Sequence, residues 1–213
     1  MTLVCWIVGA GDFDAARFAP APGDFVIAAD GGLKYLDALG AKPDLVLGDF
    51  DSLGKVPAGD NVLRYPPEKD DTDMMIAVKE GLRRGFVRFA LFGGLGGRLG
   101  HTLANIQTLM FLSKNSARGF LCGESETVTA VTDGTISFSA AHAGYISVFC
   151  LDEPARGVTL RGLKYPLNDA VMTSSVPLGV SNEFTGDAAS VTVRHGTLVI
   201  VWGDGRLEEV LRA

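Results

Sequence analysis

The fold is decided by the stretch LVLGDFDS at residues 45–52, where two carboxylates, Asp49 and Asp51, directly follow a short apolar run. The run is typical of a buried strand that ends at Gly48. Neighbouring carboxylates repel each other unless a cation neutralises them. Asp is also an ordinary turn former, so a solvated loop after a strand is the alternative for this segment taken alone.

Acidic turns follow two other strand-like segments in the same way. Residues 25–29 (FVIAA) precede Asp30, and residues 62–65 (VLRY) precede the acidic segment 70–73 (DDTD). In open parallel sheets, ligands bind outside the carboxyl ends of the strands. We therefore expect these carboxylates to assemble one site for a divalent metal. Mg²⁺ suits it, since this ion takes oxygen ligands and joins carboxylates to substrate phosphates.

Residues 1–124 alternate strand-like and helix-like segments. This alternation predicts an α/β domain with a mostly parallel sheet and helices on both faces. After about residue 125, helical periodicity gives way to short β-rich runs, which predict an all-β sandwich domain over residues 125–213. Expected strands are 3–8, 25–29, 44–47, 62–65, 87–92 and 119–122 in the first domain, and 127–131, 135–139, 145–150, 157–160, 170–174, 190–194 and 197–202 in the second.

Three helices are expected in the first domain. One begins at Leu33 and is closed by Gly40, and a second begins near Thr72, with Thr72 or Asp71 as its N-cap. The apolar spacing predicts a face with Met75, Val78 and Leu82 on the second helix, and a buried side with Leu103, Ile106 and Met110 on the third.

The composition is that of a folded protein with a substantial core: 213 residues, 47% apolar and 21% charged. The formal net charge of −6 argues against a nucleic-acid surface. Cys5, Cys122 and Cys150 are widely spaced in apolar runs, which favours core thiols in a reducing compartment. We find no targeting or membrane-spanning segment and expect a cytoplasmic protein.

A glycine-rich segment, GGLGGR at residues 93–98, follows another expected strand. Its glycines let backbone N–H groups approach an anion, and Arg98 suits a bidentate grip on it. The alternative is a plain glycine-rich connection. Neither a P-loop nor a complete Gly-x-Gly-x-x-Gly motif is present, which disfavours P-loop NTPases and standard dinucleotide dehydrogenases.

Several segments together resemble the thiamine pyrophosphokinase family in order and spacing. They are ADGG (29–32), GDFDS (48–52), EKDDTD (68–73), GGLGGRL (93–99) followed by His101, GLKYPL (162–167) and VSNE (180–183). The resemblance spans nearly the whole chain. It implies an α/β domain followed by a β-sandwich, and a homodimer with its active sites at the subunit interface. It also implies transfer of a pyrophosphoryl group from ATP to the thiamine hydroxyl, giving thiamine diphosphate and AMP.

The resemblance also implies roles for individual residues. The implied Mg²⁺ ligands are Asp49, Asp51 and Asp73; the residues that bind the ATP co-substrate are Asp30, Gly31, Lys69, Thr72, Gly94 and Arg98; the thiamine-binding residues are Ser181 and Asn182, with the partner subunit as their expected source. The catalytic set is Asp51, Asp70, Asp73 and Arg98. Arg98 offsets developing negative charge, and Asp70 is the candidate acceptor of the hydroxyl proton.

One position departs from the family, which usually has Asp where this chain has Gly100. Two alternatives therefore stay open. One is a pyrophosphokinase or kinase that acts on another hydroxymethyl acceptor, and the other is a module that binds thiamine or a nucleotide without turnover. Phe184 is also available as a stacking ring for the substrate.

Overall fold

The computed structural model describes residues 2–51, 53–54, 56–203 and 206–212, so Ser52 lies outside the described residues. The chain forms two compact units. The first comprises Met1–Thr108 and Leu121–Glu124, and the second comprises Leu109–Phe120 and Ser125–Ala213. The domain boundary between residues 124 and 125 stays a prediction.

The first unit is built on parallel strands, as the sequence predicts. The strands are β1 (Cys5–Val8), β2 (Phe25–Ala29), β3 (Leu45–Gly48), β4 (Val62–Arg64) and β5 (Arg88–Phe92). Their order is β5-β1-β2-β3-β4, and each neighbouring pair is parallel. β6 (Arg118–Cys122) follows β5 in the strand order. The apolar runs become strands because both faces of a parallel sheet are covered.

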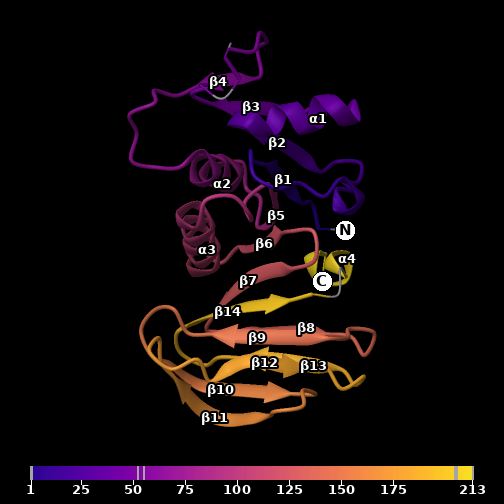
Figure 1. The fold of residues 1–213 in the computed structure, drawn as a ribbon, viewed down its shortest axis with the longest axis vertical. Coiled ribbons are helices and arrows are strands. Elements are labelled where there is room, and N and C mark those ends of the chain that lie inside the picture. Colours follow the sequence, from indigo (N-terminus) through magenta and orange to yellow (C-terminus); the bar gives the residue numbers. More distant parts are fainter. Residues whose placement is uncertain (1, 52, 55, 204–205, 213) are drawn as a thin grey trace. The chain divides into compact units, whose positions relative to one another are not determined.

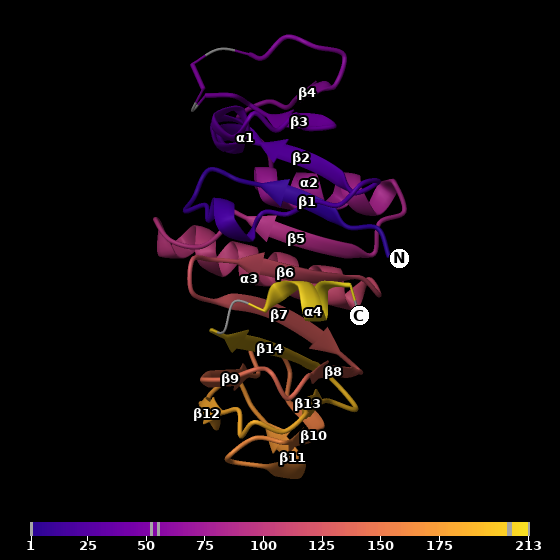
Figure 2. The same ribbon diagram turned by 90° about the vertical axis from the view of Figure 1, so that its right-hand side faces the viewer.

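Helices cover both faces of this sheet. They are the short 3₁₀ segments η1 (Ala15–Arg17) and η2 (Asp30–Gly32), and the α-helices α1 (Leu33–Leu39), α2 (Asp73–Arg83) and α3 (Leu99–Lys114). The chain runs through α1 in one direction along the sheet and through α2 in the other. Right-handed crossovers then place α1 and α2 on opposite faces, as Figures 1 and 2 show.

The predicted helix ends are confirmed by the structure. Gly40 closes α1 in the left-handed conformation, with φ of 65°. Thr72 is the N-cap of α2, where its hydroxyl oxygen accepts a hydrogen bond from the backbone N–H of Met75 at 3.2 Å. This cap fixes where the acidic segment 70–73 ends and the helix begins.

The buried helix faces differ from the prediction. On α3, Leu103 is exposed, and the buried residues are Asn105, Thr108, Leu109 and Leu112. Apolar residues lie all around this helix, so their spacing alone does not select the side that packs on the sheet. On α2, Val78 is buried as predicted, but Met75 and Leu82 are only partly covered.

The core of the first unit lies between the sheet and its helices. Its largest fully buried side chains include Trp6, Ile27, Leu47 and Phe92. The three cysteines are free and buried, which confirms them as core thiols. Burial raises the pKa of Cys122 to about 12, so its thiol stays protonated near neutral pH.

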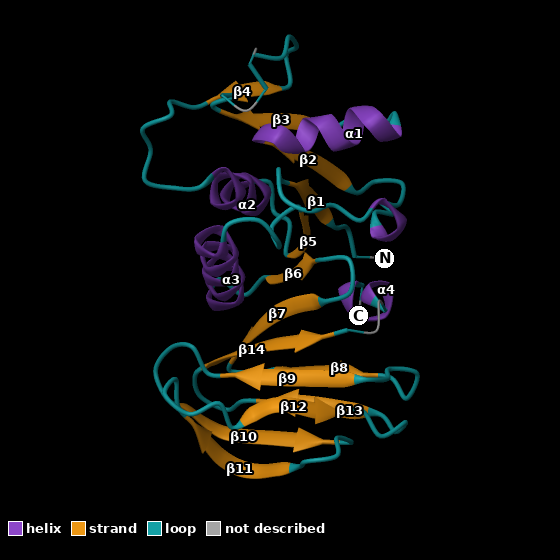
Figure 3. Cartoon of the chain, in the orientation of Figure 1, coloured by secondary structure: helices purple, strands orange, loops and turns teal. Residues whose placement is uncertain are grey.

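The second unit is made almost entirely of strands, as Figure 3 shows for the chain after β6. The strands are β7 (Thr127–Thr132), β8 (Thr135–Phe138), β9 (Tyr145–Phe149), β10 (Ala155–Arg161), β11 (Leu167–Met172), β12 (Gly179–Glu183), β13 (Ala189–Thr192) and β14 (Thr197–Trp202). One layer has the order β12-β9-β14-β7 and the other β11-β10-β13-β8. The strand pairs within these layers are antiparallel, which confirms the predicted sandwich class.

Two elements of this unit are absent from the sequence prediction. β12 carries the polar residues Ser181 and Asn182, so its sequence lacks the alternation of apolar residues that would predict a strand. The short helix α4 (Leu207–Leu211) has too few residues for a helical period to show. Neither of these elements changes the fold class.

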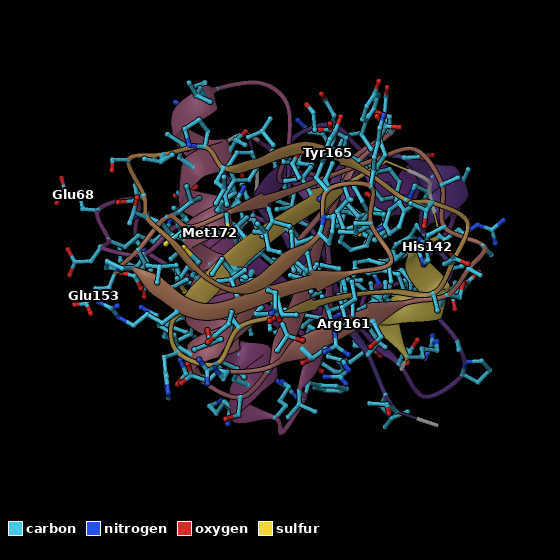
Figure 4. All side chains as sticks on the ribbon, turned by 90° about the horizontal axis from the view of Figure 1, so that it is seen from below. Glu68, His142, Glu153, Arg161, Tyr165 and Met172 are labelled. Carbon is cyan, nitrogen blue, oxygen red and sulfur yellow. The ribbon has the colours of Figure 1, made fainter. Side chains whose placement is uncertain are left out.

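Phe184 belongs to the core of the second unit, so the idea of an available stacking ring is wrong. It is 9% exposed and packs against the rings of Phe138 and His142, with centroid distances of 5.3 and 5.5 Å. His142, labelled in Figure 4, lies beside α4, with Nε2 3.8 Å from a carboxylate oxygen of Glu209.

None of the helices that the structure describes is long and apolar enough to span a bilayer.

Candidate active site

The order of the strands reverses between β1 and β5, which are neighbours in the sheet although three other strands separate them in the chain. Open α/β sheets bind ligands at such a reversal, outside the carboxyl ends of the strands. A cavity of about 640 Å³ lies there. The predicted site residues among those that line it are Asp30, Asp49, Asp51, Lys69, Asp70, Thr72, Asp73, Gly94 and Arg98.

The carboxylates of Asp30, Asp49 and Asp51 form a compact acidic group. Each offers an oxygen, and these three oxygens lie within 4.8 Å of one another. Phe50, between the two aspartates that follow β3, is buried with φ of 64°, so the turn points its ring into the core. A Cβ at Gly48 would lie 3.1 Å from the Cα of Asp30, and Gly48 has a φ of 148°, which L side chains rarely adopt, so glycine suits the close approach of this turn to Asp30.

Lys69 is the cation within the acidic site. Its Nζ lies 2.6 Å from an oxygen of Asp49 and 3.2 Å from an oxygen of Asp73. The hydrogen bond from Lys69 lowers the pKa of Asp49. Burial works against the charge on Lys69, but the two carboxylates outweigh it and raise the pKa of Lys69. Both partners are therefore ionised at neutral pH.

Asp73 has a different environment from the other carboxylates. Burial raises the pKa of Asp73, and its contact with Lys69 offsets this only in part. The predicted metal ligands are Asp49, Asp51 and Asp73, whereas the compact group contains Asp30 in place of Asp73. Three carboxylate oxygens at this spacing fit Mg²⁺, a hard ion that prefers such donors. Metal binding here, and the choice of ligands among the four carboxylates, stay predictions.

Residues 93–98, which we call the glycine loop, form another wall of the cavity. Arg98 is exposed, and its guanidinium group makes no hydrogen bond to any residue that the structure describes. It is therefore free to bind an anion. Asp70 is also exposed on the cavity wall, next to Lys69 in the chain. Gly31 is buried in η2 and does not line the cavity.

The two predicted thiamine-binding residues belong to the second unit and lie on β12. Ser181 is exposed and has a positive φ of 57°. Asn182 is 3% exposed, and its amide is used within the unit: it accepts from the backbone N–H of Tyr165 at 2.9 Å and donates to the Tyr165 carbonyl at 2.8 Å. Asn182 therefore fixes the adjoining segment at Tyr165, and its role in binding stays a prediction.

Two features of the cavity escaped the sequence analysis. Asn105 is buried on α3, and residues 9–11 (GAG) follow β1; all four line the cavity. Asn105 lies seven residues, about two helical turns, after Arg98, but α3 contains other polar residues such as Gln107 and Thr108, so no local pattern singles Asn105 out.

Two family models match the chain. One describes the catalytic domain of thiamin pyrophosphokinase and covers residues 21–121. The other describes the vitamin B1 binding domain of thiamin pyrophosphokinase and covers residues 134–198. The first contains the acidic group and the glycine loop, and the second contains Ser181 and Asn182.

Individual proteins give the same result. A thiamine pyrophosphokinase of Bacillus subtilis (strain 168) is 30% identical over 178 residues, which are 80% of this chain and 83% of that protein. A crystal structure of thiamine pyrophosphokinase from Bacillus subtilis matches with a TM-score of 0.82 at 25% identity, covering 94% of this chain and 98% of that one. A crystal structure of the thiamin pyrophosphokinase from Geobacillus thermodenitrificans matches with a TM-score of 0.81 at 26% identity, covering 95% of this chain and 98% of that one. The chain therefore belongs to the thiamin pyrophosphokinase family.

Proposed function

We propose that this chain transfers the pyrophosphoryl group of ATP to the hydroxyl of thiamine in an Mg²⁺-dependent reaction, giving thiamine diphosphate and AMP. The observation that carries the proposal is the cavity at the strand reversal. Its lining includes the acidic group of Asp30, Asp49 and Asp51 and the glycine loop, which ends in Arg98, an arginine with no side-chain partner among the described residues. A polyphosphate and its counter-ion need these two environments side by side.

The residues of the cavity act mainly by positioning charge. The glycine loop offers backbone amides to the phosphates, and Arg98 binds the oxygens on which negative charge grows. Lys69 partly neutralises the charge of Asp49 and Asp73. When bound, Mg²⁺ supplies further neutralisation of the phosphate charge at the carboxylates.

The reaction itself exchanges one phosphorus–oxygen bond for another. The thiamine hydroxyl oxygen forms a bond to the β-phosphorus of ATP, and the bond from that phosphorus to the oxygen bridging the α-phosphate breaks. The electron pair of the broken bond leaves with AMP. Asp70, an exposed carboxylate on the cavity wall, accepts the hydroxyl proton.

The direct test is to mix the protein with ATP, Mg²⁺ and thiamine and to follow AMP. We expect AMP to form only when all three are present, to stop when a chelator is added and to resume when Mg²⁺ is restored. AMP formation with a different hydroxymethyl compound, but not with thiamine, would identify another acceptor. The absence of AMP with every acceptor would favour the alternative of a module that binds thiamine or a nucleotide without turnover.

We also propose a homodimer in the cytoplasm, with Ser181 and Asn182 of the partner subunit completing the thiamine site. The free, buried cysteines support a reducing compartment. At micromolar concentration, sedimentation should show a dimer with full activity, and a Ser181→Tyr variant should raise the KM for thiamine more than the KM for ATP. A monomer that is fully active would contradict the shared site.

Gly100 provides a further prediction, because a side chain is sterically allowed there. A Cβ at Gly100 would meet nothing within 4 Å, and its φ is not in the left-handed region. Gly100→Ala should therefore stabilise α3 by about 0.5–1 kcal/mol, which corresponds to a rise of about 1–4 °C in Tm at this chain length. Gly100→Asp should stabilise it as well, since a negative charge is favourable near a helix N-terminus.

Only the Asp variant should also raise turnover with thiamine, because it restores the carboxylate that the family usually has. Gly97→Ala is the matched control: a Cβ there also meets nothing, but φ is 62°, so it should lower Tm. A fall in turnover for Gly100→Asp, with Tm unchanged, would show that this chain uses another group in its place.

A further inference from the structure

The segment that follows β1 has no role in the reaction described above. It consists of residues 9–12 (GAGD), which we call the first turn. It lies directly against the glycine loop, which follows the neighbouring strand β5. The Gly9 N–H donates to the carbonyl oxygen of Phe92, the last residue of β5, at 2.8 Å. Two further backbone hydrogen bonds join the first turn to the glycine loop itself: Gly11 N–H to Gly93 O at 2.8 Å, and Asp12 N–H to Leu95 O at 3.3 Å. The parallel pairing of β1 with β5 therefore continues beyond the ends of both strands.

The close approach of the two segments excludes side chains at the points of contact. A Cβ at Gly11 would lie 2.6 Å from the carbonyl oxygen of Gly93, and a Cβ at Gly93 would lie 2.2 Å from that of Gly9. Both neighbours are backbone atoms, so a side chain could be accommodated only if the loop itself moved. The glycines thus set the distance at which the first turn holds the glycine loop.

Asn105 of α3 holds the loop at a further point. Its side chain is 7% exposed, and its Nδ2 donates a hydrogen bond to the carbonyl oxygen of Gly94 at 2.8 Å. Three successive carbonyls of the loop, those of Gly93, Gly94 and Leu95, are therefore bound by the first turn and Asn105.

Fixing these carbonyls also fixes the amides that follow them. In a planar trans peptide, the N–H of one residue points opposite to the carbonyl of the residue before it. The orientations of the N–H groups of Gly94, Leu95 and Gly96 are therefore set. None of the three donates a hydrogen bond to a residue within the described part of the chain. All three residues line the cavity, so their amides are available to a ligand in it.

We propose that the first turn and Asn105 are positioning residues, which hold the glycine loop with its amides oriented for the phosphates of the nucleotide. The inference rests on the proposed function for the identity of the anion. It assigns to Asn105 and to Gly11 a part in nucleotide binding that acts through the loop. Preorganised backbone amides bind a charged group without first having to reorient, which is why the anchors matter for affinity.

The test compares Asn105→Leu with Thr108→Val. Leucine is close to asparagine in size and lacks the donor. Thr108 is a matched control, because it is 1% exposed on the same helix and its hydroxyl donates to the Ala104 carbonyl at 3.0 Å, away from the loop. We expect Asn105→Leu to raise the KM for ATP about tenfold, with a smaller change in kcat and in the KM for thiamine. Thr108→Val should leave these constants near those of the unchanged protein, and Asn105→Gln, which keeps the donor, should recover part of the loss.

Hydrogen–deuterium exchange measures, without any substrate, how firmly the first turn and the glycine loop are held together. The amides of residues 11 and 12, whose N–H groups are bonded to loop carbonyls, should exchange faster in Asn105→Leu and remain unchanged in Thr108→Val. Gly11→Ala should give the same increase, whereas Gly134→Ala, where the nearest atom to the new Cβ is 3.4 Å away and φ is not in the left-handed region, should not.

Unchanged exchange of the amides of residues 11 and 12 in both Asn105→Leu and Gly11→Ala would overturn the inference, as would equal effects of Asn105→Leu and Thr108→Val. The proposed function fails separately. If the unchanged protein forms no AMP but the exchange responds as expected, the loop is still held by these anchors, and the anion is one other than ATP.

Discussion

Replacing Asp51 by asparagine is expected to lower kcat/KM for the thiamine reaction about 100-fold or more while the fold is retained. Residues that merely orient a metal ligand already contribute about 10–100-fold, so losing a ligand should cost at least as much. Asp51 is exposed and lies in the compact group with Asp30 and Asp49. Asparagine has nearly the same size but no charge, so the apolar core is untouched.

Steady-state kinetics over a series of Mg²⁺ concentrations, together with a thermal melt, measure this effect. The matched control is Asp37→Asn, since Asp37 is an exposed aspartate on α1 that does not line the cavity. The control should retain activity and Tm. Near-normal rates for Asp51→Asn at low Mg²⁺ would remove Asp51 from the metal site.

The second large effect is expected at Arg98. Arg98→Met should lower kcat about 100- to 1000-fold, which is the usual consequence of removing one positioned donor from developing charge. The kcat of Arg98→Lys should lie between those of the unchanged protein and Arg98→Met, because an ammonium keeps the charge but cannot make the bidentate contact. The side chain is exposed and has no hydrogen bond to a described residue, so its loss should not affect stability.

Arg64→Met is the control for that series. Arg64 is an exposed arginine on β4 that does not line the cavity, and its loss should change neither kcat nor Tm. If Arg98→Met retained most of the activity, the charge at the transition state would have to be neutralised by another group, with Lys69 as an alternative cation on the cavity wall.

The sequence was sufficient to predict the fold class because its apolar runs are long and clearly separated. Strands such as Phe25–Ala29 and Thr197–Trp202 have the predicted limits, since turn residues bound them on both sides. The cap at Thr72 was predictable for the same local reason. β12 was not, because its polar residues are held in the sheet by pairing with β9, which is a tertiary effect.

The sequence predicted which residues form the candidate site better than it predicted how they are arranged. Acidic turns after strands indicated where the carboxylates gather, since strand ends meet at one edge of a parallel sheet. The pairing of Asp30 with Asp49 and Asp51 depends on the left-handed turn at Phe50 and on the close approach at Gly48. Asn105 was missed because its function depends on a backbone carbonyl eleven residues earlier, which no local pattern indicates.

The central claim is that a pyrophosphoryl group, and not a single phosphoryl group, moves from ATP to thiamine. Phosphorus NMR of the reaction with ATP, Mg²⁺ and thiamine tests it most directly, because it identifies both products. We predict equal amounts of thiamine diphosphate and AMP, with no accumulation of ADP. The appearance of ADP with thiamine monophosphate, or of AMP with free pyrophosphate and unchanged thiamine, would contradict the account.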